Sequence, residues 1–306
     1  MSGAVERVWL VQTPSVVADA WRVALHQACL ERGWDFKIHE RGDETPTASP
    51  NRSLLVVAWL DQAQDLTVTH WAVQLSDPVE VAALLKAQSN LSDHDTYYEA
   101  SLRLATAWRL VERGASVHWS DAETLEIAGL GRVNGPPQAT RATISRSDGP
   151  LSVFTRDQAV KAGVTSWTPE IFLYPETRQD NGPSGSFPLV GRRRLLLNGP
   201  NIFLPPGNWA FQAEISIDPP GRTEILVEWG HGHDVASLVA PISMAGRYEL
   251  SLEKEWTDVQ PADFRISLMI PALEGSFVFH GGTLARRTGE GPGEVKPEQT
   301  SAPHDH

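Results

Sequence analysis

The chain of 306 residues contains a single cysteine, Cys29. One cysteine cannot form an internal disulfide, and zinc sites built from several cysteines are excluded. Basic residues are also in the minority, because 26 Lys and Arg stand against 38 Asp and Glu and leave a formal net charge of −12. Since a nucleic-acid backbone attracts basic surfaces, this balance predicts no nucleic-acid partner.

Long apolar segments are absent as well. The longest apolar run, residues 53–60, has the length of a strand and falls far below the ~20 residues that span a bilayer. The N-terminus lacks the basic stretch and apolar core of a secretory signal. We therefore expect no membrane insertion, and a location in the cytoplasm or export by a route without a cleaved signal.

The first 135 residues alternate between apolar runs and segments with helical spacing. Residues 7–12 are an apolar run of strand length, whereas apolar residues within 16–30 recur every three or four positions, as on one helix face. The complete pattern predicts strands at 7–12, 34–38, 53–60, 70–75 and 116–119, and helices at 16–30, 78–88, 95–113 and 120–128. This order predicts an open, mostly parallel sheet of flavodoxin-like or Rossmann-like type.

Ligands of such sheets bind at the carboxyl ends of the strands, which here are followed by residues 12–15, 61–64 and 76–77. The first of these loops has no glycine that would let a pyrophosphate approach closely. The glycine cluster at 129–135 follows a predicted helix rather than a strand, and no Walker-type Gly-Lys-Ser/Thr occurs. We therefore expect no dinucleotide or ATP cofactor.

Catalytic signatures are missing from the rest of the chain too. No His-Glu-x-x-His, Gly-x-Ser-x-Gly or cysteine–histidine nucleophile pattern occurs. The motif Asp93-His94-Asp95 has the Asp-x-Asp form with which many glycosyltransferases hold a divalent cation. Its place before a predicted helix favours helix capping instead. The sequence thus assigns no catalytic residue, and it favours a noncatalytic protein over an enzyme.

After residue 135 the helical pattern weakens. Residues 136–187 predict a connecting region that ends in a polar linker, and residues 288–306, rich in Gly, Pro and charge, predict a disordered tail. Between them, residues 188–287 show apolar residues at every second position, as in Trp209 and Phe211, with turns between the runs. This pattern predicts an antiparallel β-sandwich.

The order of turns and strands in residues 188–287 resembles a known family. The run Asn198–Trp209 (NGPNIFLPPGNW) leads into alternating strands, Gly246–Leu250 (GRYEL) opens a later strand, and Gly275–Gly282 (GSFVFHGG) closes the series after Phe264–Ile266. This order resembles the jelly-roll sandwiches of carbohydrate-binding modules and of similar domains appended to bacterial polysaccharide-associated proteins. The resemblance covers the C-terminal third and implies carbohydrate binding.

The tryptophans bear on the ligand class, because an indole face packs well against the C–H face of a sugar ring. Trp209 and Trp229 lie in the apolar phase of their strands and are predicted to be core residues. Trp256 lies among polar residues (EKEWTD) and is predicted to be an exposed ligand-binding residue. Packing over one end of the sandwich is the alternative for Trp256.

Two polar clusters are further ligand-binding candidates. Arg192 and Arg194 would share one face of a strand and could pair with anionic groups such as uronates, or simply discourage strand aggregation. His231 and His233, at strand spacing, would point to one side together with Asp234. A glycine-containing loop with exposed histidines is the favoured interpretation, so no metal is predicted.

These patterns favour a noncatalytic protein that recognises a polysaccharide through the sandwich, in polysaccharide assembly or attachment at a bacterial surface. Two alternatives stay open. One is a glycosyltransferase-like enzyme that uses a sugar nucleotide at the α/β half. The other is a structural component whose sandwich forms a homo-oligomer.

Overall fold

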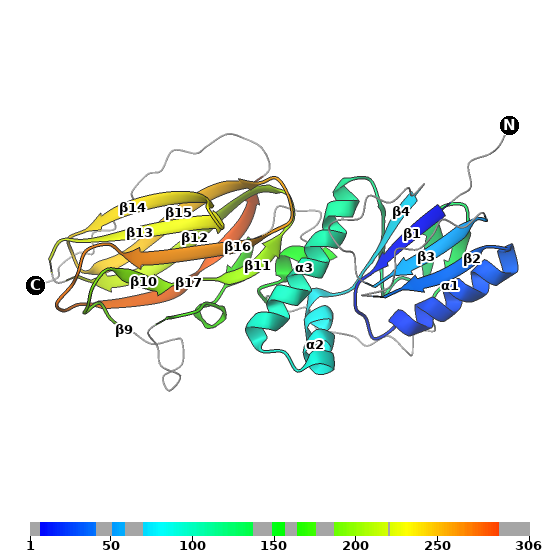
Figure 1. The fold of residues 1–306 in the computed structure, drawn as a ribbon, viewed down its shortest axis with the longest axis horizontal. Helices are drawn as coiled ribbons and strands as arrows, with labels where there is room; N and C mark the ends of the chain where they lie inside the picture. The colour runs from blue at the N-terminus through cyan, green and yellow to red at the C-terminus, as the bar shows by residue number, and fades with distance from the viewer. Residues whose placement is uncertain are drawn as a thin grey trace, which may run out of the picture.

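The computed structural model describes residues 7–40, 51–58, 70–136, 149–156, 164–175, 187–219 and 221–287. The molecule has two parts (Figure 1). The N-terminal part contains strands and helices, and the C-terminal part is made of strands. Helix α3 (Asp93–Glu112) lies between these two parts.

Five strands of the N-terminal part form a parallel sheet in the order β2-β3-β1-β4-β5. The strands are β1 (Arg7–Gln12), β2 (Asp35–His39), β3 (Ser53–Val57), β4 (His70–Leu75) and β5 (Ser116–Trp119). The prediction of a parallel sheet with helices is confirmed. Its order differs from the 3-2-1-4-5 and 2-1-3-4-5 orders of Rossmann-like and flavodoxin-like sheets, because β1 pairs with β3 and β4.

Helices cover both faces of this sheet, which explains why its inner strands β3, β1 and β4 are largely apolar. α1 (Ala18–Arg32) packs on one face, where Trp21 and Leu25 join the core formed by β1 and β3. α3 packs on the opposite face through Ala107 and Leu110. α2 (Pro78–Ser89) begins after Asp77, whose side chain accepts a hydrogen bond from the Val79 amide.

The helix predicted at 120–128 is wrong. The segment forms a hairpin of β6 (Thr124–Ile127) and β7 (Gly131–Asn134), which packs beside α1. Leu125 and Ile127 are buried and alternate with Thr124 and Glu126, which is strand periodicity rather than helix periodicity. Four residues are too short a window to distinguish the two periods from sequence.

The antiparallel strands predicted for the C-terminal part are confirmed, and they form two sheets. One has the order β10-β16-β13-β14 with β11 also paired to β16, and the other has the order β15-β12-β17-β8 with β9 also paired to β17. The strands are β8 (Val164–Trp167), β9 (Phe187–Pro188), β10 (Arg194–Leu197), β11 (Pro200–Leu204), β12 (Gly207–Asp218), β13 (Thr223–His231), β14 (Asp234–Ile242), β15 (Gly246–Trp256), β16 (Gln260–Leu268) and β17 (Ser276–Arg287).

The two sheets share one apolar core, as the layers of a β-sandwich do. At its centre the ring of Phe211 on β12 lies 5.2 Å from that of Trp229 on β13 and 4.8 Å from that of Phe264 on β16. Each of these side chains belongs to the buried phase of its strand. The two-residue apolar period therefore places the core between the sheets.

Part of the predicted connecting region belongs to this sandwich. β8, within 136–187, pairs with β17, and Trp167 is buried 5.9 Å from the ring of Trp229. Two short 3₁₀ helices, Ser152–Phe154 and Pro169–Ile171, also lie in this region. Phe154 packs in the same core. A four-residue strand between breaker-rich segments gives too weak a sequence pattern to be recognised.

α3 contacts the sandwich as well as the parallel sheet. Its residues Ala100, Leu104 and Ala105 share the sandwich core with Phe203 of β11. The Phe203 amide donates a hydrogen bond to Ser101 Oγ at 2.9 Å. One helix therefore contributes to the cores of both parts of the molecule.

Candidate functional site

The predicted exposure of Trp256 is wrong. Trp256 is 3% exposed, and its ring lies 5.0 Å from that of Trp229. It closes β15 in the same phase as the buried Leu250 and Leu252, so the phase of the strand continues through the charged neighbours. Trp167, Trp209 and Trp229 are also 1% exposed or less. The indoles of the sandwich therefore form its core, and a sugar-stacking platform of tryptophans is excluded there.

Arg192 and Arg194 do not share a strand face, because β10 begins only at Arg194. The guanidinium of Arg194 donates hydrogen bonds to the carbonyls of Pro188, Leu189 and Arg192 at 2.8 to 3.4 Å. The guanidinium thus stabilises the conformation of the loop that precedes β10. Arg192 is exposed. The structure therefore does not bring these two residues together as an anion site.

His231 lies at the end of a strand and His233 lies in the turn that follows, so the two are not aligned on one strand. β13 ends at His231, which pairs with Asp234 at the start of β14, and the turn consists of Gly232 and His233. Asp234 forms an ion pair with Lys254 at 2.5 Å. The interpretation as a glycine-containing loop is confirmed, and the strand spacing on which joint ligation depended is absent.

The Asp-x-Asp motif lies in the first turn of α3, directly after the capping residue. Ser92 is the N-cap, and its Oγ accepts a hydrogen bond from the Asp95 amide at 3.1 Å. Asp93 forms an ion pair with Lys86 of α2 at 2.5 Å. Within the described residues no group of three or more His, Cys, Asp or Glu could hold a metal ion. Burial raises the pKa of the Cys29 thiol to about 11, so this group stays protonated at neutral pH.

The carboxyl end of β1, where a parallel sheet would bind a ligand, is occupied by a carboxylate of the protein. Glu80 of α2 is 7% exposed and accepts hydrogen bonds from the Val16 amide at 2.6 Å and from Ser15 Oγ at 3.0 Å. A helix N-terminus of this kind commonly binds phosphate. Because Glu80 takes that position before α1, a nucleotide phosphate would have to displace it.

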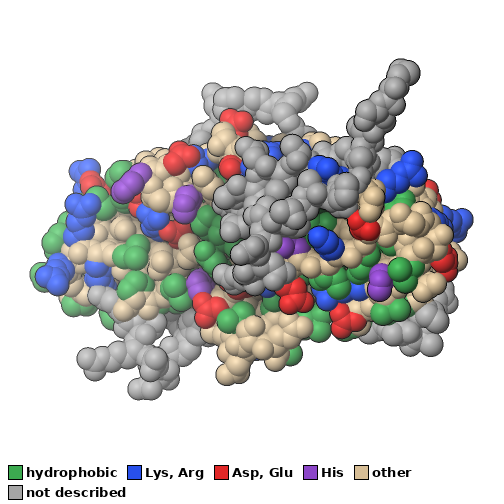
Figure 2. All heavy atoms as spheres, turned by 45° about the vertical axis from the view of Figure 1, so that its right-hand side comes forward, with side chains coloured by type: hydrophobic (Ala, Val, Ile, Leu, Met, Phe, Trp, Pro, Cys, Tyr) green, Lys and Arg blue, Asp and Glu red, His purple; other side chains and the backbone are tan. Residues whose placement is uncertain are grey.

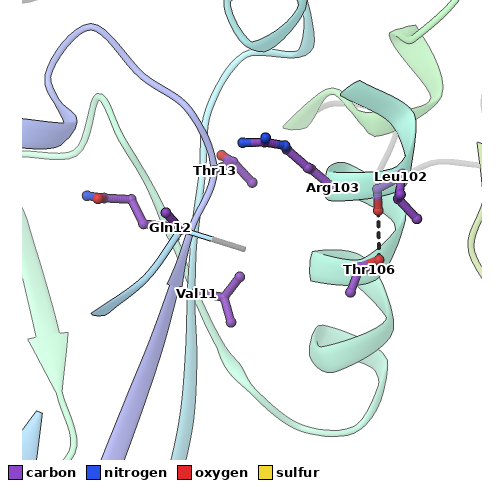
Figure 3. A pocket seen from close by; sticks show the side chains of 7 residues that line it. Val11, Gln12, Thr13, Leu102, Arg103 and Thr106 are labelled. Atoms are coloured by element: carbon purple, nitrogen blue, oxygen red, sulfur yellow. Dashed lines mark hydrogen bonds between the residues drawn. The ribbon is translucent and has the colours of Figure 1, made fainter. Parts of the chain in front are cut away.

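The crevice between this strand end and α3 is small. Its volume is about 20 Å³, room for a single water molecule. Arg103 extends from α3 toward Thr13, while Gln12 points away from the crevice (Figure 3). Thr13 Oγ1 is bonded to Ser76 Oγ at 3.2 Å. The predicted loop at 61–64 lies outside the described residues.

A polar face that sequence reasoning did not single out lies on the outside of the sheet β15-β12-β17. We use the term polar face for the following residues: Gln212, Glu214, Ser216, Arg247, Glu249, Ser251, His280 and Thr283. Cross-strand pairing brings these side chains together, since Gln212 lies opposite Ser251 and Thr283, and Ser216 lies opposite Arg247. In the sequence, only the polar residues at every second position of 208–218 pointed to this face. The sequence does not tell which strands are neighbours.

Side chains of the polar face are bonded across strands. Gln212 Nε2 donates to Glu249 Oε1 at 3.1 Å, and Ser216 Oγ lies 2.7 Å from His280 Nε2. Arg247 forms an ion pair with Glu214. Partial burial and the Arg247 guanidinium lower the pKa of His280, so its imidazole is neutral at neutral pH. The face offers fixed donors and acceptors. Its only aromatic ring is the imidazole of His280.

Charges on the molecule are mixed. On the view in Figure 2, the described Lys and Arg side chains are interspersed with Asp and Glu and form no continuous basic area. No helix among the described residues is long and apolar enough to cross a membrane.

No protein-family model and no curated protein matches the sequence. Among solved structures, the chain is similar to a family 61 carbohydrate-binding module in complex with β-1,4-galactotriose, at 10% identity and TM-score 0.27, over 41% of this chain and 88% of that one. It is similar to the xylan-binding module CBM15, at 8% identity and TM-score 0.27, over 41% and 97%. A structure of infectious bursal disease virus matches at 10% identity and TM-score 0.24, over 41% and 31%. Likenesses this distant do not identify a function.

Proposed function

We propose that this protein recognises a neutral polysaccharide without catalysis, through the polar face of the sandwich, in polysaccharide assembly or cell-surface attachment. The observation that carries the proposal is the set of cross-strand hydrogen bonds, such as that between Gln212 and Glu249, on an open sheet face. Amide, carboxylate, hydroxyl and imidazole groups supply both donors and acceptors, which match the hydroxyl groups of a sugar chain.

The rigidity of this face supports binding. The side chains project from paired strands, and their bonds to one another hold their rotamers before a ligand arrives. Preorganised groups lose less conformational entropy on binding than mobile ones, so weak individual contacts add up along a polymer. The length of β12, which carries Gln212, Glu214 and Ser216, provides successive contact positions along one strand.

The charge of the face favours neutral over anionic chains. Glu249 on β15 adds negative charge, whereas Arg247 is already paired with Glu214. Arg194, one of the two arginines expected to bind uronates, donates its hydrogen bonds to carbonyls of its own loop. An anionic polymer would therefore meet repulsion on this face.

Titration calorimetry of the full chain with soluble xylan, galactan and substituted cellulose tests the proposal, with an acidic polysaccharide for comparison. Gln212→Ala combined with Glu249→Ala removes two polar groups from the face and should weaken binding about tenfold, since a net hydrogen bond contributes about 0.5–1.5 kcal/mol. Glu228→Ala, on the outer side of the opposite sheet, is the matched control and should bind as the parent does.

The proposal would be contradicted if none of the neutral polysaccharides bound. Equal weakening by Glu228→Ala would also contradict it, since this would place the ligand elsewhere or indicate a nonspecific charge effect.

A further inference from the structure

A second cavity is lined by none of the residues of the polar face. It lies between α2, the first turns of α3 and residues 149–155, and has a volume of about 230 Å³. One wall is α2, with Val79, Ala82 and Ala83, and apolar Pro150 and Leu151 belong to the segment opposite. The cavity is therefore a slot with apolar sides.

The size of the slot limits its ligand. Pockets for drug-sized molecules occupy about 300–1,000 Å³, and one water takes about 30 Å³ in the liquid. A cavity of 230 Å³ thus suits a small molecule with a single ring.

Three residues that line the slot carry hydroxyl groups whose hydrogens are already engaged. Thr96 Oγ1 donates to the Ser92 carbonyl at 2.7 Å, Ser152 Oγ donates to Thr165 Oγ1 at 3.0 Å, and Thr155 Oγ1 donates to the Ser152 carbonyl at 2.9 Å. A hydroxyl oxygen that donates its hydrogen retains lone pairs for accepting. These oxygens are therefore acceptors, and they select a ligand with several donors.

The remaining polar groups carry no net charge. Lys86 and Asp93 line the slot and form an ion pair at 2.5 Å, with side chains 54% and 76% exposed. Burial, and then the Asp93 carboxylate, raises the pKa of Tyr97, so the phenol stays protonated. The Tyr97 hydroxyl has no hydrogen-bond partner within the described residues and is available as a donor. A paired cation and anion favour a neutral ligand over an ion.

We propose that this slot binds one neutral, hydroxyl-rich ring, the size of a single sugar. Its hydroxyl groups would donate to Thr96, Ser152 and Thr155, and its apolar C–H face would pack against α2, as sugar rings pack on apolar surfaces. This site goes beyond the polar face and does not depend on it, because it takes a monosaccharide rather than a chain.

Saturation-transfer NMR on the full chain with glucose, galactose, mannose and xylose tests this site, with cyclohexylamine as a charged probe of similar size. At least one sugar should give a saturable signal with a Kd of about 1 mM, the range expected for a dozen heavy atoms. Ala83→Leu fills the slot and Thr155→Val removes one acceptor, and each should raise that Kd about tenfold or more. Circular dichroism confirms that both variants fold.

Glu249→Ala, which alters the polar face, should leave monosaccharide binding unchanged, so the two sites fail or succeed separately. The proposal is overturned if no sugar saturates the parent protein, if only the amine binds, if Ala83→Leu binds like the parent, or if Glu249→Ala abolishes the signal.

Discussion

Gly282 of β17 lies against the sandwich core without room for a side chain. A Cβ atom there would stand 2.5 Å from Phe211 Cζ and 2.6 Å from the Gln212 carbonyl oxygen. The absence of a side chain leaves room for the ring of Phe211 against β17. A single atom at this position therefore affects the centre of the core.

Gly282→Ala should lower the free energy of unfolding by about 1–3 kcal/mol, because overpacking displaces the aromatic ring and the backbone. Gly246→Ala, at the start of β15, is the matched control, since its nearest contact would be 3.6 Å away on Tyr248. Urea unfolding of the full chain measures both. Equal stability of the two variants would show that the core adjusts without cost.

At the scale of elements, α1 depends on a residue from another helix. Its N-cap position, Val17, makes no side-chain capping bond, and Glu80 of α2 instead bonds the Val16 amide just before it. The negative carboxylate also interacts favourably with the positive end of the helix dipole. A residue 64 positions away in sequence thus fixes the start of α1.

Glu80→Gln keeps the side-chain shape but removes its charge, and should destabilise the protein by about 1–2 kcal/mol. Glu31→Gln, near the end of α1 and exposed, should change stability by less than about 0.5 kcal/mol. Thermal or urea unfolding of both variants gives the comparison. A Glu80 variant as stable as the parent would mean that the capping bond contributes nothing.

The elements that could be predicted from sequence are those with long, regular periods. The strands at 7–12 and 70–75 agree with the structure, and the helix predicted at 16–30 agrees with α1 to within two residues at each end, because local spacing determines them. The hairpin at 124–134 was too short for a reliable period. Trp256 could have been placed by counting the strand phase from Leu250, rather than by the polarity of its neighbours.

The sites were harder to predict than the elements, since each is assembled from distant segments. The polar face needs the pairing of β12 with β15 and β17, and the slot joins residues near 80 and 95 with residues near 150. Periodicity gives the face of one strand but not the identity of its neighbour. Glu80 likewise reads as an ordinary first-turn acid until α1 is placed beside it.

At the scale of the whole molecule, α3 joins the two parts. Leu104 belongs to the sandwich core, whereas Leu110 of the same helix packs on the parallel sheet. Two ion pairs add to this contact, Arg109 with Asp258 at 2.9 Å and Arg286 with Glu112 at 2.6 Å. The contact is largely apolar, unlike the polar contacts between domains that move independently.

The two parts should therefore unfold in one transition. Circular dichroism at the helix band follows the N-terminal part, and tryptophan fluorescence follows both, so the two midpoints should coincide. Leu104→Ala creates a cavity at the shared core and should lower both midpoints together. Two separated transitions in the parent protein would show that the parts are thermodynamically independent.

The shared helix also has a consequence for direction. Two domains that are joined only by a flexible linker adopt many relative orientations. A polymer bound by one domain then has no fixed orientation relative to the other. Here β12 keeps one angle to the parallel sheet, because α3 packs on both sides (Figure 1). A polysaccharide bound along β12 would therefore have a fixed orientation relative to the N-terminal part. A partner that holds the N-terminal part would set the direction in which the polysaccharide extends.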